Sequence, residues 1–440
     1  MRKLKDSDYF LALHRSKKFL KQQERNDQKA SHKLQQPTHI SRPINLLNNL
    51  GLAEQFAHHG HNFDITIPEI FSIIHNPKET LRVLCGFAET IRKNNTKIKN
   101  ITVDHGKMIK LDLSAESILD FLILEMKREE ANKRKKIRFG GHYPKDAKLR
   151  RYLRAVGIIK NLKIEHEYLS EKEESTLRIF RMINKSRLQK VNVGTADIKE
   201  RKVKEFVDHI NSCLEDHGQQ LTVSTRASLA HYTGEILGNA EEHSGLQDWT
   251  IAGYLDNEHE SHLSEIAIFN FGKTIAETFK ELPKYSYAYK MVHPYVEAHR
   301  RRSLFGTSWT EDDLLTLVAL QGNISSKNES PEQDRGQGTV DLIHFFQNVH
   351  HECTKDTDTS CEAKMAILSG NTHIMFDGTY QMKSDPSGRQ VIAFNKNNDL
   401  NEPPDNKYVT HLGKASFPGV IIGIRFPMVT SQTRGLNNGD

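Results

Sequence analysis

Strand-like and helix-like segments alternate along most of this chain, and this alternation limits the folds open to it. Residues 63–71 and 99–113 show the two-residue period of strands, and residues 78–94 between them carry apolar side chains at helical spacing. The elements predicted next are a helix from residue 114, a short strand over 136–141 and a helix over 146–158. This order predicts an α/β unit in the first half of the chain.

A second unit of mixed helices and strands begins near residue 195. An amphipathic helix is predicted over 198–216, and another opens at Ser224 or Thr225. The strands predicted for this unit cover residues 265–275, 363–370, 372–378 and 419–428. The fold class is therefore α+β or α/β, and these strands are expected to form a sheet with helices on one face.

Length and composition set the broad class of protein. A chain of 440 residues exceeds what one core usually organises, so two or three domains are expected. The mean hydropathy is -0.62, and no run approaches the roughly 18 to 20 apolar residues of a membrane helix. The amino terminus lacks the apolar segment of a secretory signal, and the four cysteines do not resemble a disulfide framework. A cytoplasmic protein without membrane association is expected.

The positive charge of the chain is concentrated at its amino terminus. The net charge is +6, and residues 1–45 hold eleven Lys or Arg against four Asp or Glu. This composition is typical of a solvated basic helix or tail, and it is also compatible with phosphate contacts to a nucleic acid. Phe19 is the only aromatic residue in segment 14–34, so the stacking residues of a single-strand binder are missing.

The helix that opens near residue 224 carries a polar row at four-residue spacing beside an apolar row. The polar row is His231, Glu235, Asn239 and His243, and the apolar row is Leu229, Tyr232, Ile236 and Ala240. Residues four apart share one helical face, so the apolar row is expected to face the core. A polar row next to it usually faces water, although His231, Glu235 and His243 at this spacing could also ligate a metal such as zinc. Zinc hydrolysis is disfavoured because the order H-E-x-x-H is absent.

Two glycine-bearing segments lie downstream of this helix. Asn270 and Gly272 stand where the strand over 265–275 breaks into a turn. The second segment, Arg335, Gly336, Gln337 and Gly338, comes directly before an apolar helix. Glycines at a helix start leave backbone amides free to bind phosphate.

This ordered set of motifs resembles the GHKL superfamily of ATPases, which includes histidine kinases and heat-shock chaperones, over about residues 196–430. The resemblance implies a two-layer α/β sandwich that binds ATP and Mg²⁺. It implies that Glu235 orients or deprotonates the water that attacks the γ-phosphate, and that Asn239 ligates Mg²⁺ through its side-chain oxygen. It further implies that His243 orients the end of the helix or contacts the lid.

The same resemblance assigns phosphate binding to the second glycine segment. Backbone N–H groups of Gly336 and Gly338 would hold phosphate, and Arg335 or Gln337 would add a side-chain contact. The lid over the nucleotide would be residues 276–334. Within that lid, residues 299–303 read HRRRS, which suits phosphate, a partner or a solvated helix end.

The middle motif departs from the superfamily pattern D-x-G-x-G. Asn270 replaces the Asp that accepts a hydrogen bond from adenine, Gly272 is retained, and Lys273 and Thr274 follow. An amide still offers an acceptor, but it lacks the charge that strengthens the bond, and it adds a donor. Thr274 adds bulk near the base. Weaker or altered base selection is therefore expected.

The first α/β unit loosely resembles the STAS domains of bacterial regulatory switches. In that family a phosphorylatable serine starts a helix, and Ser114 and Ser117 are the candidates here, with a plain helix cap as the alternative. The resulting layout is a basic, partly helical arm over 1–60, a STAS-like domain over 61–190, a GHKL-like ATP-binding domain over 195–430 and a tail over 431–440.

Three functions are compatible with these motifs. The first is a Mg-ATP-binding protein, a slow ATPase that acts as a regulatory switch through lid closure and a protein partner. The second is a protein serine/threonine kinase of the anti-sigma-factor type. The third is a non-hydrolysing nucleotide sensor or interaction scaffold in a bacterial regulatory or defence system. Release of phosphate by the protein alone would support the ATPase. Transfer of label from ATP to a partner protein would support the kinase, and nucleotide binding without turnover would support the sensor.

Overall fold

The chain divides into two compact units, Met1–Arg42 and Pro43–Asp440, and nearly all the described residues belong to the second. The computed structural model describes residues 42–47, 58–94, 98–133, 137–157, 169–184, 195–216, 220–221, 223–243, 249–257, 263–302, 309–326, 328–330, 337–354 and 363–427. Most of the predicted basic arm and the whole predicted tail lie outside these residues.

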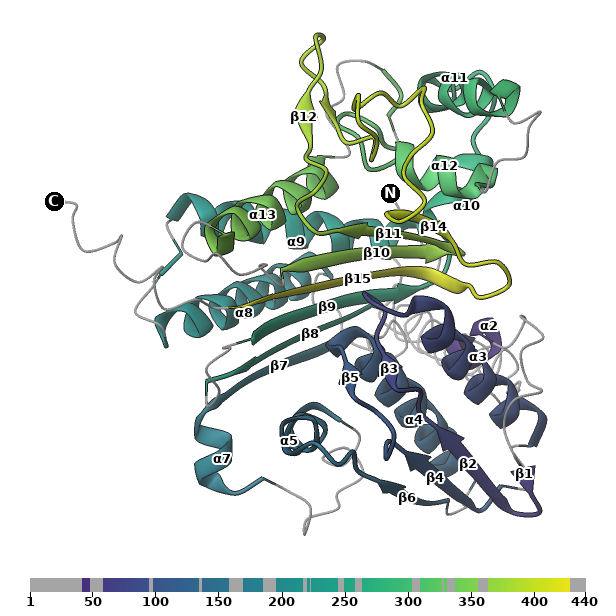
Figure 1. Cartoon of the computed structure of the whole chain (residues 1–440), viewed down its shortest axis with the longest axis vertical. Coiled ribbons are helices and arrows are strands. Elements are labelled where there is room, and N and C mark those ends of the chain that lie inside the picture. The colour runs from purple at the N-terminus through teal and green to yellow at the C-terminus, as the bar shows by residue number, and fades with distance from the viewer. Residues whose placement is uncertain are drawn as a thin grey trace, which may run out of the picture. The chain divides into compact units, whose positions relative to one another are not determined.

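A seven-stranded antiparallel sheet forms the centre of the second unit, with strand order β14-β11-β10-β15-β9-β8-β7 (Figure 1). Its strands are β7 Leu177–Asn184, β8 Trp249–Asp256, β9 Leu263–Phe271, β10 Lys364–Gly370, β11 Thr372–Phe376, β14 Val409–His411 and β15 Phe417–Pro427. Four of them correspond to the strands predicted from the sequence. The edge strand β7 comes from residues that the sequence layout assigned to the first α/β domain.

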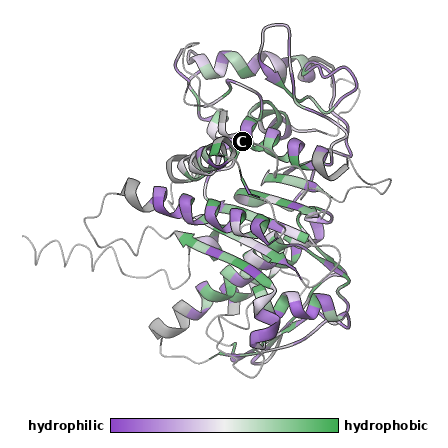
Figure 2. Ribbon diagram, turned by 90° about the vertical axis from the view of Figure 1, so that its left-hand side faces the viewer, coloured by the Kyte–Doolittle hydropathy of each residue, from purple (hydrophilic) through white to green (hydrophobic). Residues whose placement is uncertain are grey.

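Three long helices cover one face of this sheet (Figure 1). They are α8 Thr195–Glu215, α9 Val223–His243 and α13 Gln337–Thr354. Their apolar rows join the strands in one core, in which Phe206, Leu237 and Phe346 are almost fully buried. In Figure 2 the strands carry much of the hydrophobic colour, whereas the helices alternate between hydrophobic and hydrophilic residues, as expected for amphipathic helices.

The smaller α/β part is built on a four-stranded sheet of order β1-β2-β4-β6, in which β2, β4 and β6 are parallel. Its elements are α2 Arg42–Leu47, β1 His58–His59, β2 Asn62–Thr66, β3 Ile70–Phe71, α3 Pro77–Asn94, β4 Asn100–Asp104, β5 Lys110–Leu111, α4 Leu113–Lys133, β6 Arg138–His142, α5 Ala147–Val156 and α7 Glu171–Ser175. The alternation predicted for this part of the chain is confirmed.

Helix α4 packs against the second face of the large sheet, on β8, β9 and β15. Phe121 of α4 stacks on Phe271 with ring centroids 5.2 Å apart and meets Phe269 edge to face at 5.8 Å. The expectation of helices on one face only was wrong. The reason is visible in β8 and β9, which are buried at nearly every position and therefore need cover on both faces.

Polar contacts also join α4 and α5 to the sheet. The carboxylate of Glu265 in β9 accepts hydrogen bonds from the Leu113 N–H at 2.6 Å and from the Tyr152 hydroxyl at 3.0 Å. Arg425 Nη1 of β15 lies 3.5 Å from the other oxygen of Glu265. All four groups are wholly or largely buried, so these contacts satisfy polar atoms that would otherwise be costly inside the protein.

The segment between β9 and α13 forms a small helical layer with its own apolar cluster. Its helices are α10 Ile275–Lys280, α11 Tyr287–Arg302 and α12 Glu311–Val318. Within the HRRRS stretch, His299 is buried and its Nε2 lies 2.8 Å from the Leu400 carbonyl, while the side chains of the three arginines lie outside the described residues. A hairpin of β12 Lys383–Ser384 and β13 Gln390–Val391 completes the fold.

Glu116 of α4 gives the fold a specific dependence on pH. Its side chain is 1% exposed, and burial raises its pKa from 4.5 to about 7, although the positive charge of Arg181 acts in the opposite direction. The neutral carboxyl therefore stabilises the folded state fully below pH 4.5, and this contribution is lost as the pH rises through 7.

We expect Glu116→Gln to remove this dependence, because a neutral amide of the same shape needs no proton. The difference in free energy of unfolding between the variant and the wild type should shift in favour of the variant by roughly 2 kcal/mol from pH 5 to pH 8.5. Urea denaturation at both values measures this difference, with Glu79→Gln on the exposed side of α3 as the control. A gain that is equal at both pH values would contradict the assignment.

Candidate functional site

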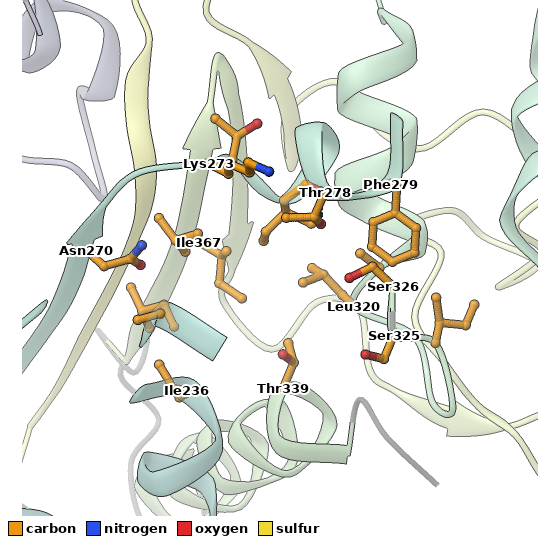
Figure 3. A pocket seen from close by; sticks show the side chains of 17 residues that line it. Ile236, Asn270, Lys273, Thr278, Phe279, Leu320, Ser325, Ser326, Thr339 and Ile367 are labelled. Carbon is orange, nitrogen blue, oxygen red and sulfur yellow. Dashed lines mark hydrogen bonds between the residues drawn. The ribbon is translucent and has the colours of Figure 1, made fainter. Parts of the chain in front are cut away.

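A cavity lies between the large sheet and the helices α9, α10 and α13, and it encloses about 830 Å³, part of it open to solvent (Figure 3). Its lining comes from four separate parts of the chain. These are Ile236 and Ala240; Asn270, Lys273, Thr274, Ile275, Thr278 and Phe279; Ala319, Leu320, Ile324, Ser325 and Ser326; and Thr339, with Ile367, Val420 and Ile422 from the sheet. Three of these parts contain or adjoin the motifs singled out in the sequence.

Helix α9 brings the first motif to the cavity. Ile236 and Ala240 line it, and each directly follows one member of the polar row, Glu235 or Asn239. The side chains of Glu235, Asn239 and His243 lie outside the described residues, although all three positions are helical.

The buried row of α9 differs from the expected one. Leu229 and Ala240 are buried as expected, but Leu237 and Thr233 take the other inner positions. Thr233 satisfies its hydroxyl by donating to the Leu229 carbonyl at 2.8 Å, so a polar residue can occupy the inner face. Ile236 is left half-buried at the cavity wall.

Asn270 brings the second motif to the cavity from the end of β9. It pairs with Trp249 on one side and Val420 on the other, and its side chain is directed toward the cavity (Figure 3). The residue is only 8% exposed. Among the residues that the structure describes, none forms a hydrogen bond with its side-chain amide. Because Asn270 lines the cavity, its amide keeps a donor and an acceptor available to a ligand there.

Two glycines fix the backbone around Asn270. Gly272 has φ +145° and donates its N–H to the Pro418 carbonyl at 3.0 Å. Gly419 has φ +134°, and a Cβ there would lie 2.0 Å from the Asn270 carbonyl oxygen. Both positions require glycine because of conformation, and Gly419 also because of the close approach of β15 to β9. Gly272 therefore has a backbone role beside Asn270.

Lys273 and Thr274 connect β9 to α10. Thr274 caps α10: its hydroxyl accepts the Glu277 N–H at 3.1 Å, and the Glu277 carboxylate accepts the Thr274 N–H at 2.7 Å. Lys273 is about half exposed, and its Nζ lies 2.5 Å from Glu281. The sequence did not reveal this capping box as the reason for a threonine in place of the second glycine.

The third motif lies at the start of α13. The helix begins at Gln337, two residues before the predicted start, so Gly338 lies in its first turn and is buried. Thr339 lines the cavity from this turn (Figure 3). Arg335 and Gly336, together with the side chain of Gln337, lie outside the described residues.

Sequence reasoning missed the wall formed by residues 319–326. Ser325 and Ser326 come from a polar loop whose composition resembles any surface turn (Figure 3). Their place at the cavity depends on Gln321, which is fully buried, accepts the Ile392 N–H at 2.7 Å and donates to the Leu317 carbonyl at 2.6 Å. No short sequence motif signals such a long-range contact.

The serines considered for phosphorylation are buried within α4. Ser114 is 1% exposed and Ser117 is 5% exposed, so neither is accessible to a kinase in this fold. Neither caps the helix, because Asp112 does: its Oδ1 accepts the Ala115 N–H at 2.9 Å, and its Oδ2 accepts the Ser72 hydroxyl at 2.5 Å. The helix-cap prediction for Ser114 and Ser117 was therefore wrong, and their burial argues against phosphorylation in this fold.

Two further expectations concern metals and membranes. Across the described ranges, no group of three or more His, Cys, Asp or Glu side chains is arranged to hold a metal ion. In the same part of the chain, every helix is too short or too polar to cross a bilayer.

No family model, curated protein or solved structure matches this chain.

The close approach at Gly419 predicts a specific mutational cost. Gly419→Ala should lower the free energy of unfolding by about 3 kcal/mol or more, because it combines a strained φ with a clash against Asn270. Gly388→Ala is the matched control, since Gly388 has φ +84° with open space around it and should cost about 1 kcal/mol. Equal losses for the two variants in urea denaturation would show that the contact with β9 is unimportant.

Proposed function

We propose that the chain binds ATP with Mg²⁺ in the cavity under α10 and hydrolyses it slowly, as a nucleotide-dependent regulatory switch. The observation that carries this proposal is the convergence of separate sequence segments. The sequence linked the motifs of α9, the end of β9 and the start of α13 only by their order along the chain. Each of these segments contributes at least one residue, such as Ile236, Asn270 or Thr339, to the lining of one cavity.

The chemistry of the lining suits an adenine nucleotide. Small-molecule sites are mostly apolar with a few placed polar groups. Ile236, Phe279 and Leu320 offer apolar surface to a base. Asn270 supplies a buried amide that can accept from the adenine amino group, and the turn at Thr339 supplies the helix start that favours phosphate.

The hydrolytic part of the proposal depends on α9. Asn239 would ligate Mg²⁺ and Glu235 would orient or deprotonate the attacking water, because these residues adjoin the lining positions Ala240 and Ile236. Oxygen ligands from an amide and from the phosphates are those that Mg²⁺ prefers. The regulatory part depends on residues 276–334, which line the cavity through α10 and residues 319–326 and would respond to the nucleotide.

Two variants separate binding from hydrolysis. Asn239→Ala should abolish ATP binding in calorimetry with Mg²⁺, because the metal loses its protein ligand. Glu235→Ala should retain binding within about threefold and lose at least 100-fold in phosphate release, because only the general base is removed. His231→Ala is the control, since His231 is exposed on the same polar row.

Other outcomes of this experiment identify the alternative functions. Label transferred from ATP to a protein partner would replace hydrolysis with a protein kinase activity. Binding without phosphate release in the wild type would leave a nucleotide sensor. A wild-type protein that binds no adenine nucleotide would overturn the proposal as a whole.

Asn270→Asp tests which atom of the ligand meets this residue. The amide can accept from the 6-amino group of adenine or donate to the 6-oxo group of guanine, whereas an ionised carboxylate can only accept. The ratio of ATP to GTP affinity at pH 8 should therefore rise by tenfold or more in the variant. Competition between the two nucleotides in calorimetry measures the ratio. An unchanged ratio would place the base away from Asn270.

A further inference from the structure

Lys273 is the one residue with a charged side chain among the described residues that line the cavity under α10. The other polar side chains of this lining are the amide of Asn270 and the hydroxyls of serine and threonine residues. The Lys273 side chain is 47% exposed, so it lies at the rim of the cavity (Figure 3). A negatively charged ligand would therefore meet its cation, among the described residues, at this rim.

The ammonium group of Lys273 is held by Glu281, which does not line the cavity. Its Nζ lies 2.5 Å from Oε2 of this carboxylate. Both side chains are about half exposed, so water screens the pair and little free energy is needed to separate it. The lysine stem is long and flexible, so the ammonium can leave Glu281 and turn into the cavity without a movement of the backbone.

Glu281 stands at a position where an acidic side chain is disfavoured. It is the C-cap of α10, and its N–H donates to carbonyls of the last turn. The partial negative charge of the carbonyls at a helix end favours a cation there. The neighbouring Lys280 does not compensate Glu281, because it pairs with Asp312 of α12. A residue that opposes a local preference often has a functional reason, and the contact that Glu281 makes is the one with Lys273.

We propose that Glu281 restrains Lys273 at the rim, and that a negatively charged group of the ligand displaces this carboxylate when it binds in the cavity. This inference rests on the proposed function, in which the phosphates of ATP supply the negative charge. The ammonium is paired before and after the exchange, and the released carboxylate is exposed to water, so no charge is left buried without a partner. Lys273 thus selects anionic ligands, and Glu281 lowers the affinity with which they bind.

The experiment measures Mg-ATP binding to the full chain by calorimetry at low salt. Glu281→Gln should tighten binding by about threefold, because the amide no longer competes for the ammonium. Lys273→Met should weaken binding by about tenfold, because the cation at the rim is lost. In the double variant, Glu281→Gln should add no change to the effect of Lys273→Met, because the carboxylate then has no ammonium to hold.

Two controls change the same charges elsewhere. Lys284→Met removes an exposed lysine after α10, and Glu171→Gln removes an exposed acid on α7, and both should bind Mg-ATP as the wild type does. A gain in affinity for Glu281→Gln cannot come from a loss of folding.

The outcomes separate this inference from the proposed function. If the wild type binds ATP and Glu281→Gln binds it equally or more weakly, the exchange is wrong and the ATP site stands. Equal tightening by Glu281→Gln with and without Lys273 would also overturn the exchange, because it would reveal a general effect of charge. A wild type that binds no adenine nucleotide would overturn both proposals.

Discussion

The structure depends on the burial of β9 on both faces. The two-residue period of the strand divides its side chains between the two layers. Ile266, Ile268 and Asn270 face the layer of α9 and α13, whereas Glu265, Phe269 and Phe271 face α4. Packing on both faces therefore fixes the register in which β9, from Leu263 to Phe271, pairs with β15 and β8. A slip of one residue would exchange the faces, placing the Glu265 carboxylate in the apolar core and removing Asn270 from the cavity.

The sequence was sufficient for the parts of the fold that depend on local patterns. The helices α3, α8 and α9 and the strands β9, β10 and β15 follow directly from their apolar spacing. Ile236, Asn270 and Thr339, which belong to or adjoin the three motifs, line one cavity. The contact of α4 with the large sheet could not be predicted, because its residues look like those of any buried helix. Its partners are distant in the sequence: Phe121 meets Phe269 and Phe271, and the N–H of Leu113 meets Glu265. Ser114 and Ser117 were misread for the same reason, since only the packed structure shows that Asp112 is the cap.

In the segment between β9 and α13, helix α12 is tied to the sheet by buried polar contacts. Asp313 of α12 is fully buried, accepts the Thr372 hydroxyl at 2.7 Å and lies 3.0 Å from His411 Nδ1. Displacing α12 as a whole would leave these groups buried without partners, at a cost well above the roughly 1 kcal/mol net value of one hydrogen bond. α12 is therefore held firmly to the sheet. Together with the buried Gln321, it fixes residues 319–326 at the cavity.

Attachment to the sheet also explains why the middle motif carries Thr274 in place of the second glycine of the pattern D-x-G-x-G. A glycine at position 274 would allow more backbone freedom but would remove the hydroxyl that caps α10, at a cost of roughly a few tenths of a kcal/mol. The Thr274 methyl also packs closely on the turn at Gly370, where a Cβ would lie 3.3 Å away. The next residue, Ile275, donates its N–H at 2.8 Å to the Ser369 hydroxyl, which in turn donates to the Gly419 carbonyl. Thr274 thus belongs to a chain of contacts that ties the first lid helix to β10 and β15. Its presence reflects the attachment of α10 to the sheet, and it does not by itself argue against a nucleotide in the cavity.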